Sequence, residues 1–113
     1  MDSQPGKLLR LYVNERDEYK GKPLYEAIVE RCRELDLAGV TVFRGVEGFG
    51  GSAELHRSHL LGSDQPIVIT VVESPEKARE ALPVFQAMMN SGMIAVTDVE
   101  VTVVSNGAVR PLR

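Results

Sequence analysis

The fold of this 113-residue chain is constrained most by one segment. This segment begins with a strong helix-start signal and is bordered by apolar, β-branched runs. Ser74-Pro75-Glu76 provides an N-cap serine, a proline at the first helical position and an acidic residue in the first turn. The helix is predicted to run to about Asn90, where Gly92 stops it. Pro83 should kink it, because proline removes one backbone hydrogen bond.

A second helix is predicted earlier in the chain. Pro23 suits its first position, and Gly39 is expected to end it as the C′ glycine. Apolar side chains recur at helical spacing between these two residues, which predicts one buried stripe. The stripe consists of Leu24, Ile28, Cys32 and Leu35.

Four strands are predicted, over residues 8–14, 40–46, 66–73 and 94–104, from their β-branched and alternating apolar residues. With the helices, the order is β-α-β-β-α-β. This order predicts an α+β fold of the ferredoxin-like kind: an antiparallel sheet with both helices on one face.

The third predicted strand is apolar on both of its sides. Ile67, Ile69 and Val71 point one way, whereas Val68 and Val72 point the other way with Thr70. A sheet face open to water normally carries polar side chains, and a large exposed apolar patch usually marks an interface. We therefore expect an oligomer built through the open face of the sheet.

Composition narrows the functional classes. The net charge of −3 and the lack of a basic stripe argue against a nucleic-acid groove. Cys32 cannot form an internal disulfide, no apolar run approaches a membrane span, and no signal peptide is recognisable. We expect one cytoplasmic domain over residues 1–113 that is not embedded in a membrane, with flexible tails at 1–6 and 105–113.

The connection over residues 47–64 is far longer than a plain hairpin needs. Its glycines allow backbone N–H groups to form an anion-binding nest, Arg44 and Arg57 could bind phosphate, and Phe49 could stack on a base. The alternative is a flexible turn in which Phe49 packs on a neighbouring subunit. Residue chemistry alone favours the turn.

Catalytic and metal-binding patterns are weak. His56 and His59 would share one face of a helical turn within residues 53–61 and could bind a metal with Glu54 or Asp64, but two solvated histidines are the simpler interpretation. Asp98 and Glu100 share a strand face, which is more typical of surface ion pairs than of an acid–base pair. No catalytic set emerges, so we do not expect an enzyme.

Three sequence segments together resemble a known family. They are GKPLYEAIVERCRELDLAGVTVFRGVEGFGG, DQPIVITVVESPEKAREALPVF and VTDVEV, within residues 8–104. They resemble the PII-like family catalogued as domain of unknown function 190 (DUF190), which is similar to the nitrogen-regulatory PII proteins and to the CutA-type proteins. The resemblance implies a ferredoxin-like homotrimer whose sheets face a three-fold axis.

The resemblance also implies an adenine nucleotide in a cleft between subunits. The turn before the last strand, Asn90-Ser91-Gly92-Met93, lacks the Gly-Asp-Gly-Lys pattern that grips phosphate in PII proteins, which favours AMP or ADP over ATP. No cofactor is required. The ligand-binding residues that the resemblance implies are Arg44, Gly45, Glu47, Gly48, Phe49, Gly50, Gly92, Met93 and Arg110.

The leading functional hypothesis is therefore a PII-like signalling protein. A small effector would order the 47–64 loop, which would then regulate a partner such as a transporter or an enzyme. With the resemblance included, the ligand interpretation of the glycine loop overtakes the simple turn. The alternative is a CutA-like metal-homeostasis protein that uses His56 and His59.

Overall fold

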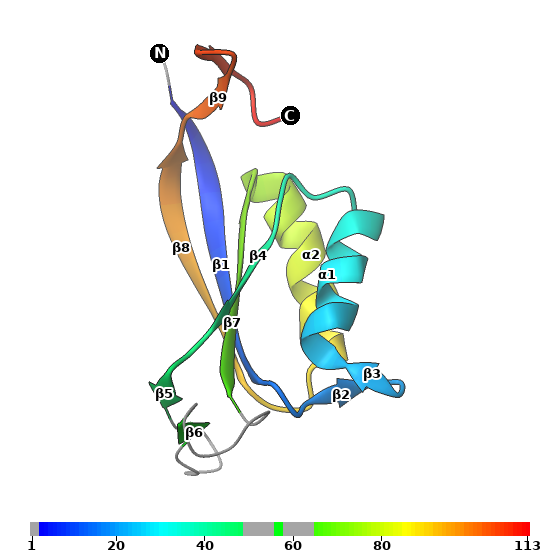
Figure 1. Cartoon of the computed structure of the whole chain (residues 1–113). Coiled ribbons are helices and arrows are strands. Elements are labelled where there is room, and N and C mark those ends of the chain that lie inside the picture. Colours follow the sequence, from blue (N-terminus) through cyan, green and yellow to red (C-terminus); the bar gives the residue numbers. More distant parts are fainter. Residues whose placement is uncertain (1–2, 49–55, 58–64) are drawn as a thin grey trace.

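The computed structural model describes residues 3–48, 56–57 and 65–113. Figure 1 shows two layers: an antiparallel sheet in the order β4-β7-β1-β8, and two helices that cover one of its faces. This arrangement confirms the predicted α+β, ferredoxin-like fold. The bounds are Gln4–Asn14 for β1, Thr41–Arg44 for β4, Pro66–Glu73 for β7, Met93–Val101 for β8, Leu24–Glu34 for α1 and Pro75–Met88 for α2.

Three two-stranded pairs accompany this sheet in the described residues. Two of them turn through residues with positive φ, Lys20-Gly21 (φ 50° and 84°) and Asn106-Gly107 (φ 53° and 79°). Two consecutive residues with positive φ are typical of tight two-residue hairpins. The pairs are β2 (Glu18–Tyr19) with β3 (Lys22–Pro23), β5 (Glu47–Gly48) with β6 (His56–Arg57), and β9 (Val103–Ser105) with β10 (Ala108–Arg110).

The core lies between the helix layer and the facing side of the sheet. Ile67, Ile69 and Val71 of β7 are at most 1% exposed, so of the two apolar faces of this strand theirs is the one that packs against the helices. Phe85 of α2 and Ile28 of α1 are fully buried against it. The other side of the sheet carries no helix (Figure 1).

The end of α1 differs from the prediction. The helix ends at Glu34, and Asp36, not Gly39, adopts the left-handed conformation, with φ 57°. The N–H of Leu37 donates to the Cys32 carbonyl at 3.0 Å, and the N–H of Asp36 to the Arg33 carbonyl at 3.0 Å. These two bonds form a Schellman motif, and aspartate is one of the few non-glycine residues that tolerate its left-handed position.

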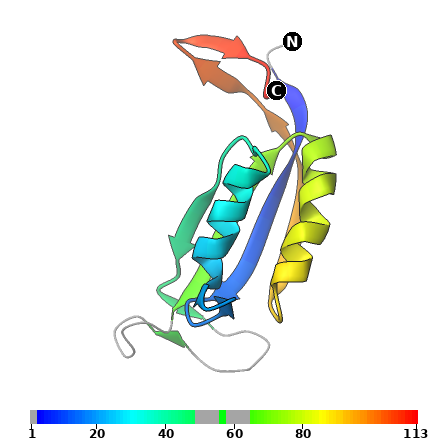
Figure 2. The same ribbon diagram turned by 90° about the vertical axis from the view of Figure 1, so that its right-hand side faces the viewer.

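The C-terminal segment, which was expected to be a flexible tail, contains a hairpin and a side-chain contact to the sheet. Residues 103–110 form the β9–β10 hairpin (Figure 2). The Arg113 guanidinium donates to the Glu73 carboxylate. Glu73 is fully buried and also accepts the backbone N–H groups of Ala38, at 2.6 Å, and Ser74, at 2.8 Å. Because Glu73 lies 40 positions before Arg113, no local pattern indicates this contact.

Candidate functional site

The long connection begins and ends at one end of the sheet. β4 leads into it after Arg44, and β7 leaves it at Pro66. The same end holds the last residues of β1 and the start of β8 at Met93, since β1 runs antiparallel to both β7 and β8 (Figure 1). Most of the predicted ligand-binding residues therefore lie at one end of the molecule.

Gly45 holds together the two stems of this connection, which are the residues just after β4 and those just before β7. Its N–H donates to the Pro66 carbonyl at 2.6 Å. A Cβ atom at Gly45 would lie 2.7 Å from Cγ of Pro66, so any larger residue would push the stems apart. Beyond this point Gly48 of β5 pairs with His56 of β6. Gly45 was predicted to bind a ligand. The close approach to Pro66 gives a structural reason for a glycine here that is independent of any ligand.

Glu15 connects both stems, and sequence reasoning missed it. Its carboxylate accepts from Nη2 of Arg44 at 2.5 Å, and its N–H donates to the Gln65 carbonyl at 2.8 Å. The Glu15 side chain is 15% exposed and that of Arg44 54%. The ion pair holds the Arg44 guanidinium at the base of the loop, with half of its surface open to a ligand. The only signal in the sequence is that Glu15 directly follows the first predicted strand.

The turn between α2 and β8 requires Gly92. Its φ is 117°, and a Cβ atom there would collide with the Tyr12 carbonyl oxygen. Met93, which pairs with Tyr12 in the sheet, is 58% exposed. A cavity of about 390 Å³ lies beside this turn, and its lining includes Gln86 and Asn90. The turn thus combines a rigid backbone, an exposed thioether and amide groups.

The predicted site residues do not converge within one chain. Arg44 and Gly45 follow β4 at one edge of the sheet, whereas Gly92 and Met93 lie at the start of β8 on the opposite edge. Three strand spacings, roughly 14 Å, separate the two edges. Arg110 is the last residue of β10, whose hairpin lies beyond the opposite end of the sheet (Figure 2). It lines a cavity of about 600 Å³ there. A site that uses all of them would need more than one subunit.

Several predicted residues fall outside the described structure. Phe49, Gly50 and His59 lie in its gaps, and only the backbones of Glu47 and His56 are described. His56 belongs to a strand, so residues 56–57 do not adopt the predicted helical turn. The described residues contain no group of three metal-ligating side chains. Metal binding by His56 and His59 stays a prediction.

The other candidate reactive groups have structural partners. Asp98 forms an ion pair with Lys7, and Glu100 accepts a hydrogen bond from the Ser3 hydroxyl at 2.8 Å. Cys32 is 2% exposed, and burial raises the pKa of its thiol to about 11. At neutral pH this thiol stays protonated and is therefore a poor nucleophile.

The open face of the sheet is apolar, as the third strand predicted. Val72 and Phe43 are 37% and 54% exposed there. Strand register places Leu8 opposite Val72 and Tyr12 opposite Val68 on the same face. Together with Met93 these side chains form an apolar patch with members on all four strands, interrupted by Arg10 and Thr70, which share this face. A patch of this kind marks an interaction surface.

Comparison with known proteins identifies relatives along most of the chain. The family model described as DUF190, Uncharacterized ACR, matches residues 6–101. The UPF0166 protein of Aquifex aeolicus is 37% identical over 97 residues, which cover 84% of this chain and 91% of that protein. The UPF0166 protein of Methanocaldococcus jannaschii is 31% identical over 98 residues, covering 84% and 90%.

Three solved structures share the fold at low sequence identity. CPII, a nitrogen regulatory PII-like protein from Thiomonas intermedia bound to ADP, AMP and bicarbonate, has a TM-score of 0.62 and 21% identity, covering 88% of this chain and 90% of that one. A putative PII-like signaling protein from Thermus thermophilus has a TM-score of 0.68 and 22% identity, covering 89% and 93%. The divalent ion tolerance protein CutA1 from Ehrlichia chaffeensis has a TM-score of 0.58 and 14% identity, covering 89% and 85%.

Neither α1 nor α2, the helices of the described residues, is long and apolar enough to cross a membrane.

Proposed function

Since this chain belongs to the DUF190 family, as its sequence resemblance predicted, we propose that it is a PII-like regulatory protein which binds AMP or ADP between the subunits of a homotrimer. It acts by binding rather than by catalysis, and it works in the cytoplasm. The observation that carries the proposal is the division of the candidate site between the two edges of one sheet. Each edge holds half of a ligand site, and only a second subunit can supply the other half.

Assembly through the open face would bring the two halves together. In a ring of three subunits with the apolar patch inward, the β4 edge of one subunit lies next to the β8 edge of its neighbour. Arg44 and Gly45 then face Gly92 and Met93 across the boundary. The patch supports this arrangement because Phe43 and Met93, more than half exposed in one chain, belong to these two edge strands.

The chemistry of the two halves suits an adenylate with few phosphates. The Arg44 guanidinium supplies a charge-assisted donor for a phosphate group, and the glycine loop supplies backbone N–H groups. Met93 offers a polarizable side chain for the face of an adenine ring. The turn residues 90–93 contain no lysine, so they supply no second cation for a triphosphate. The ADP and AMP bound to CPII are consistent with this class of ligand.

Regulation would pass through the 47–64 connection. Its two stems are held by Gly45 and by the Glu15–Arg44 ion pair, so a ligand that contacts Arg44 acts directly on the base of the loop. Nucleotide binding selects one arrangement of the loop through its higher affinity for that arrangement. The loop in this arrangement then binds or releases a partner protein, a transporter or an enzyme.

Isothermal titration of the purified protein with AMP, ADP and ATP, with and without magnesium, tests the proposal. We expect saturable AMP or ADP binding near one site per subunit, in a protein whose mass by light scattering is that of a trimer. Arg44→Gln should weaken binding about tenfold, because a charge-assisted hydrogen bond to phosphate is lost. Arg79→Gln, which changes an exposed arginine on α2, is the matched control. A trimer that binds none of the three nucleotides would refute nucleotide binding.

A further inference from the structure

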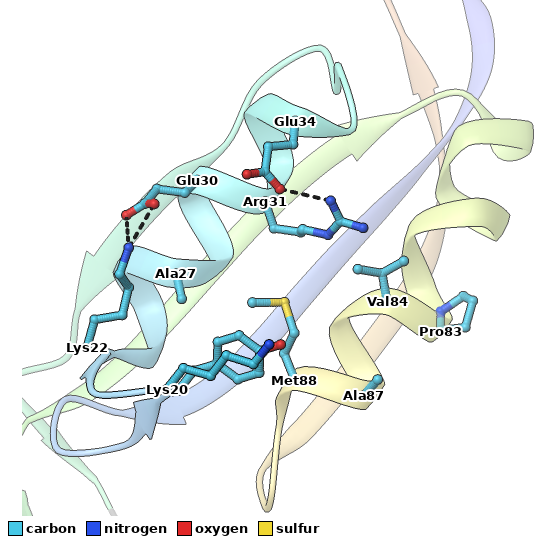
Figure 3. A pocket seen from close by; sticks show the side chains of 11 residues that line it. Lys20, Lys22, Ala27, Glu30, Arg31, Glu34, Pro83, Val84, Ala87 and Met88 are labelled. Atoms are coloured by element: carbon cyan, nitrogen blue, oxygen red, sulfur yellow. Dashed lines mark hydrogen bonds and ion pairs between the residues drawn. The ribbon is translucent and has the colours of Figure 1, made fainter.

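The helix layer carries a groove on the side of the molecule away from the open sheet face. It lies between α1 and α2, is closed at one end by the β2–β3 hairpin, and has a volume of about 730 Å³ (Figure 3). Small-molecule sites in proteins commonly have volumes of roughly 300–1,000 Å³. In the proposed trimer the sheets face inward, so this groove would stay accessible.

The floor of the groove is apolar. Ala27 of α1 and Met88 of α2 are 6% and 7% exposed and form its base, and Val84 and Ala87 of α2 form the opposite wall. Two of these four residues are alanines, so the side chains do not fill the space between the helices (Figure 3). An apolar ligand body in this space would exclude water from all four side chains.

The rim of the groove is charged, and most of its charges are paired. Nζ of Lys22 lies 2.9 and 2.8 Å from the two carboxylate oxygens of Glu30. Nη1 of Arg31 lies 2.8 Å from the Glu34 carboxylate. The opposite charges within each of these two ion pairs cancel. Lys20 makes no ion pair within the described part of the chain, and its ammonium lies 5.3 Å from the centroid of the Tyr19 ring. The rim therefore has one uncompensated positive charge.

Backbone geometry places this charge at the end of the groove. Lys20 and Gly21 form the two-residue turn of the β2–β3 hairpin, both with positive φ, and the flanking residues Tyr19 and Lys22 pair with each other. The Lys20 side chain extends from the turn toward Met88 (Figure 3), with its ammonium over the Tyr19 ring. Lys20 is an exposed residue, so its cation lies beside the apolar floor and stays open to solvent.

We propose that this groove is a second binding site, for a small amphipathic monoanion: an apolar body carrying one carboxylate, sulfonate or similar acidic group. The acidic group pairs with Lys20, and the apolar body lies on Ala27, Val84, Ala87 and Met88. The site belongs to a single chain and is separate from the nucleotide cleft. The anion can therefore bind in this groove whether or not a nucleotide binds between the subunits.

Fluorescence titration with 8-anilinonaphthalene-1-sulfonate tests this site, because the dye has one sulfonate and an apolar body. We expect saturable binding at one dye per chain. Lys20→Gln should weaken it about fivefold through loss of the ion pair. Ala87→Trp should weaken it more than about tenfold, because the indole would fill the groove from an exposed helix position. Arg79→Gln is the matched control and should change affinity less than about twofold, since Arg79 is an exposed cation of α2 that does not line the groove.

A second probe separates charge recognition from general apolar adsorption. N-phenyl-1-naphthylamine is the same skeleton without the sulfonate, so its binding should be weaker and should not respond to Lys20→Gln. Circular dichroism and light scattering check that each variant keeps its fold and mass. No saturable binding of the sulfonate dye, or equal binding by wild type, Lys20→Gln and Ala87→Trp, would overturn the proposal. The latter result would place the dye elsewhere, for example on the open sheet face.

Discussion

At the scale of single residues, Glu73 connects three parts of the chain. Its carboxylate binds Arg113, the N–H of Ala38 after α1 and the N–H of Ser74 before α2. Burial alone would raise the pKa of the Glu73 carboxyl, but these hydrogen bonds outweigh it and hold the pKa below its usual value. The ionised form is therefore the one that stabilises the fold.

Because its pKa is lower in the folded state, Glu73 stabilises the protein fully above the unfolded-state pKa of about 4.3. This contribution is lost as the pH falls through the folded-state pKa. We expect Glu73→Gln to lower the free energy of unfolding by about 2 kcal/mol at pH 7. The difference from wild type should shrink below about pH 4. Urea unfolding at pH 7 and pH 3 measures this difference in the free energy of unfolding, with the exposed Glu18→Gln variant as control. An equal difference at both values would contradict this role.

The Glu15–Arg44 pair should couple the two stems of the loop. A double-mutant cycle with Glu15→Gln and Arg44→Gln measures the coupling energy between these two side chains. Half of the Arg44 side chain is exposed to solvent, so we expect a coupling energy of only about 0.5–1 kcal/mol at low salt. It should fall in about 1 M salt, where exposed charges are screened. Coupling that is absent at low salt would mean that the ion pair does not hold the loop base in solution.

Sequence reasoning found the residues that act through local geometry and missed those that act through distant contacts. Ser74 was predicted as an N-cap, and its hydroxyl accepts the Lys77 N–H at 3.2 Å. Glu15 and Glu73 look like ordinary charged residues, one just after a predicted strand and the other at the end of one. Their importance comes from Arg44 and Arg113, 29 and 40 positions away. One sequence contains no signal for such pairs.

At the scale of elements, the ends of helices and strands were the hardest to predict. The third predicted strand, 66–73, and the start of α2 coincide with the structure, since proline and alternating apolar residues mark them directly. The end of α1 was wrong because Asp36 takes the left-handed position expected of Gly39. No strand was predicted over the β2–β3 hairpin, because its strands are two residues long.

The two glycines after the helices should respond differently to alanine. Gly92→Ala forces φ 117° on an alanine and pushes its Cβ into the Tyr12 carbonyl, so we expect a loss of at least about 2 kcal/mol in the free energy of unfolding. Gly39→Ala should be neutral or slightly stabilising, because nothing lies within 4 Å of its Cβ position. Denaturant unfolding of both variants compares them directly. A neutral Gly92→Ala would contradict the turn geometry.

At the scale of the whole molecule, the order of elements sufficed to predict the fold, because few arrangements bury two helices on a four-stranded antiparallel sheet. It could not place the candidate site. The chain brings Gly45 and Gly92 to the same end of the sheet but to opposite edges. In the proposed trimer these two edges meet only between neighbouring subunits, and local sequence patterns do not describe assembly.

The open sheet face should control assembly and ligand binding together. Phe43→Asp places a charge in the apolar patch, where burial without a partner is costly, so we expect the light-scattering mass to fall to that of one chain. Ala87→Asp, exposed on the helix layer, should leave the mass unchanged. Adenylate binding should be lost with assembly in Phe43→Asp, because each cleft needs two subunits. A monomeric variant that binds AMP or ADP as tightly as wild type would place the nucleotide within one chain, and the Arg44 and Met93 edges would then be parts of different sites.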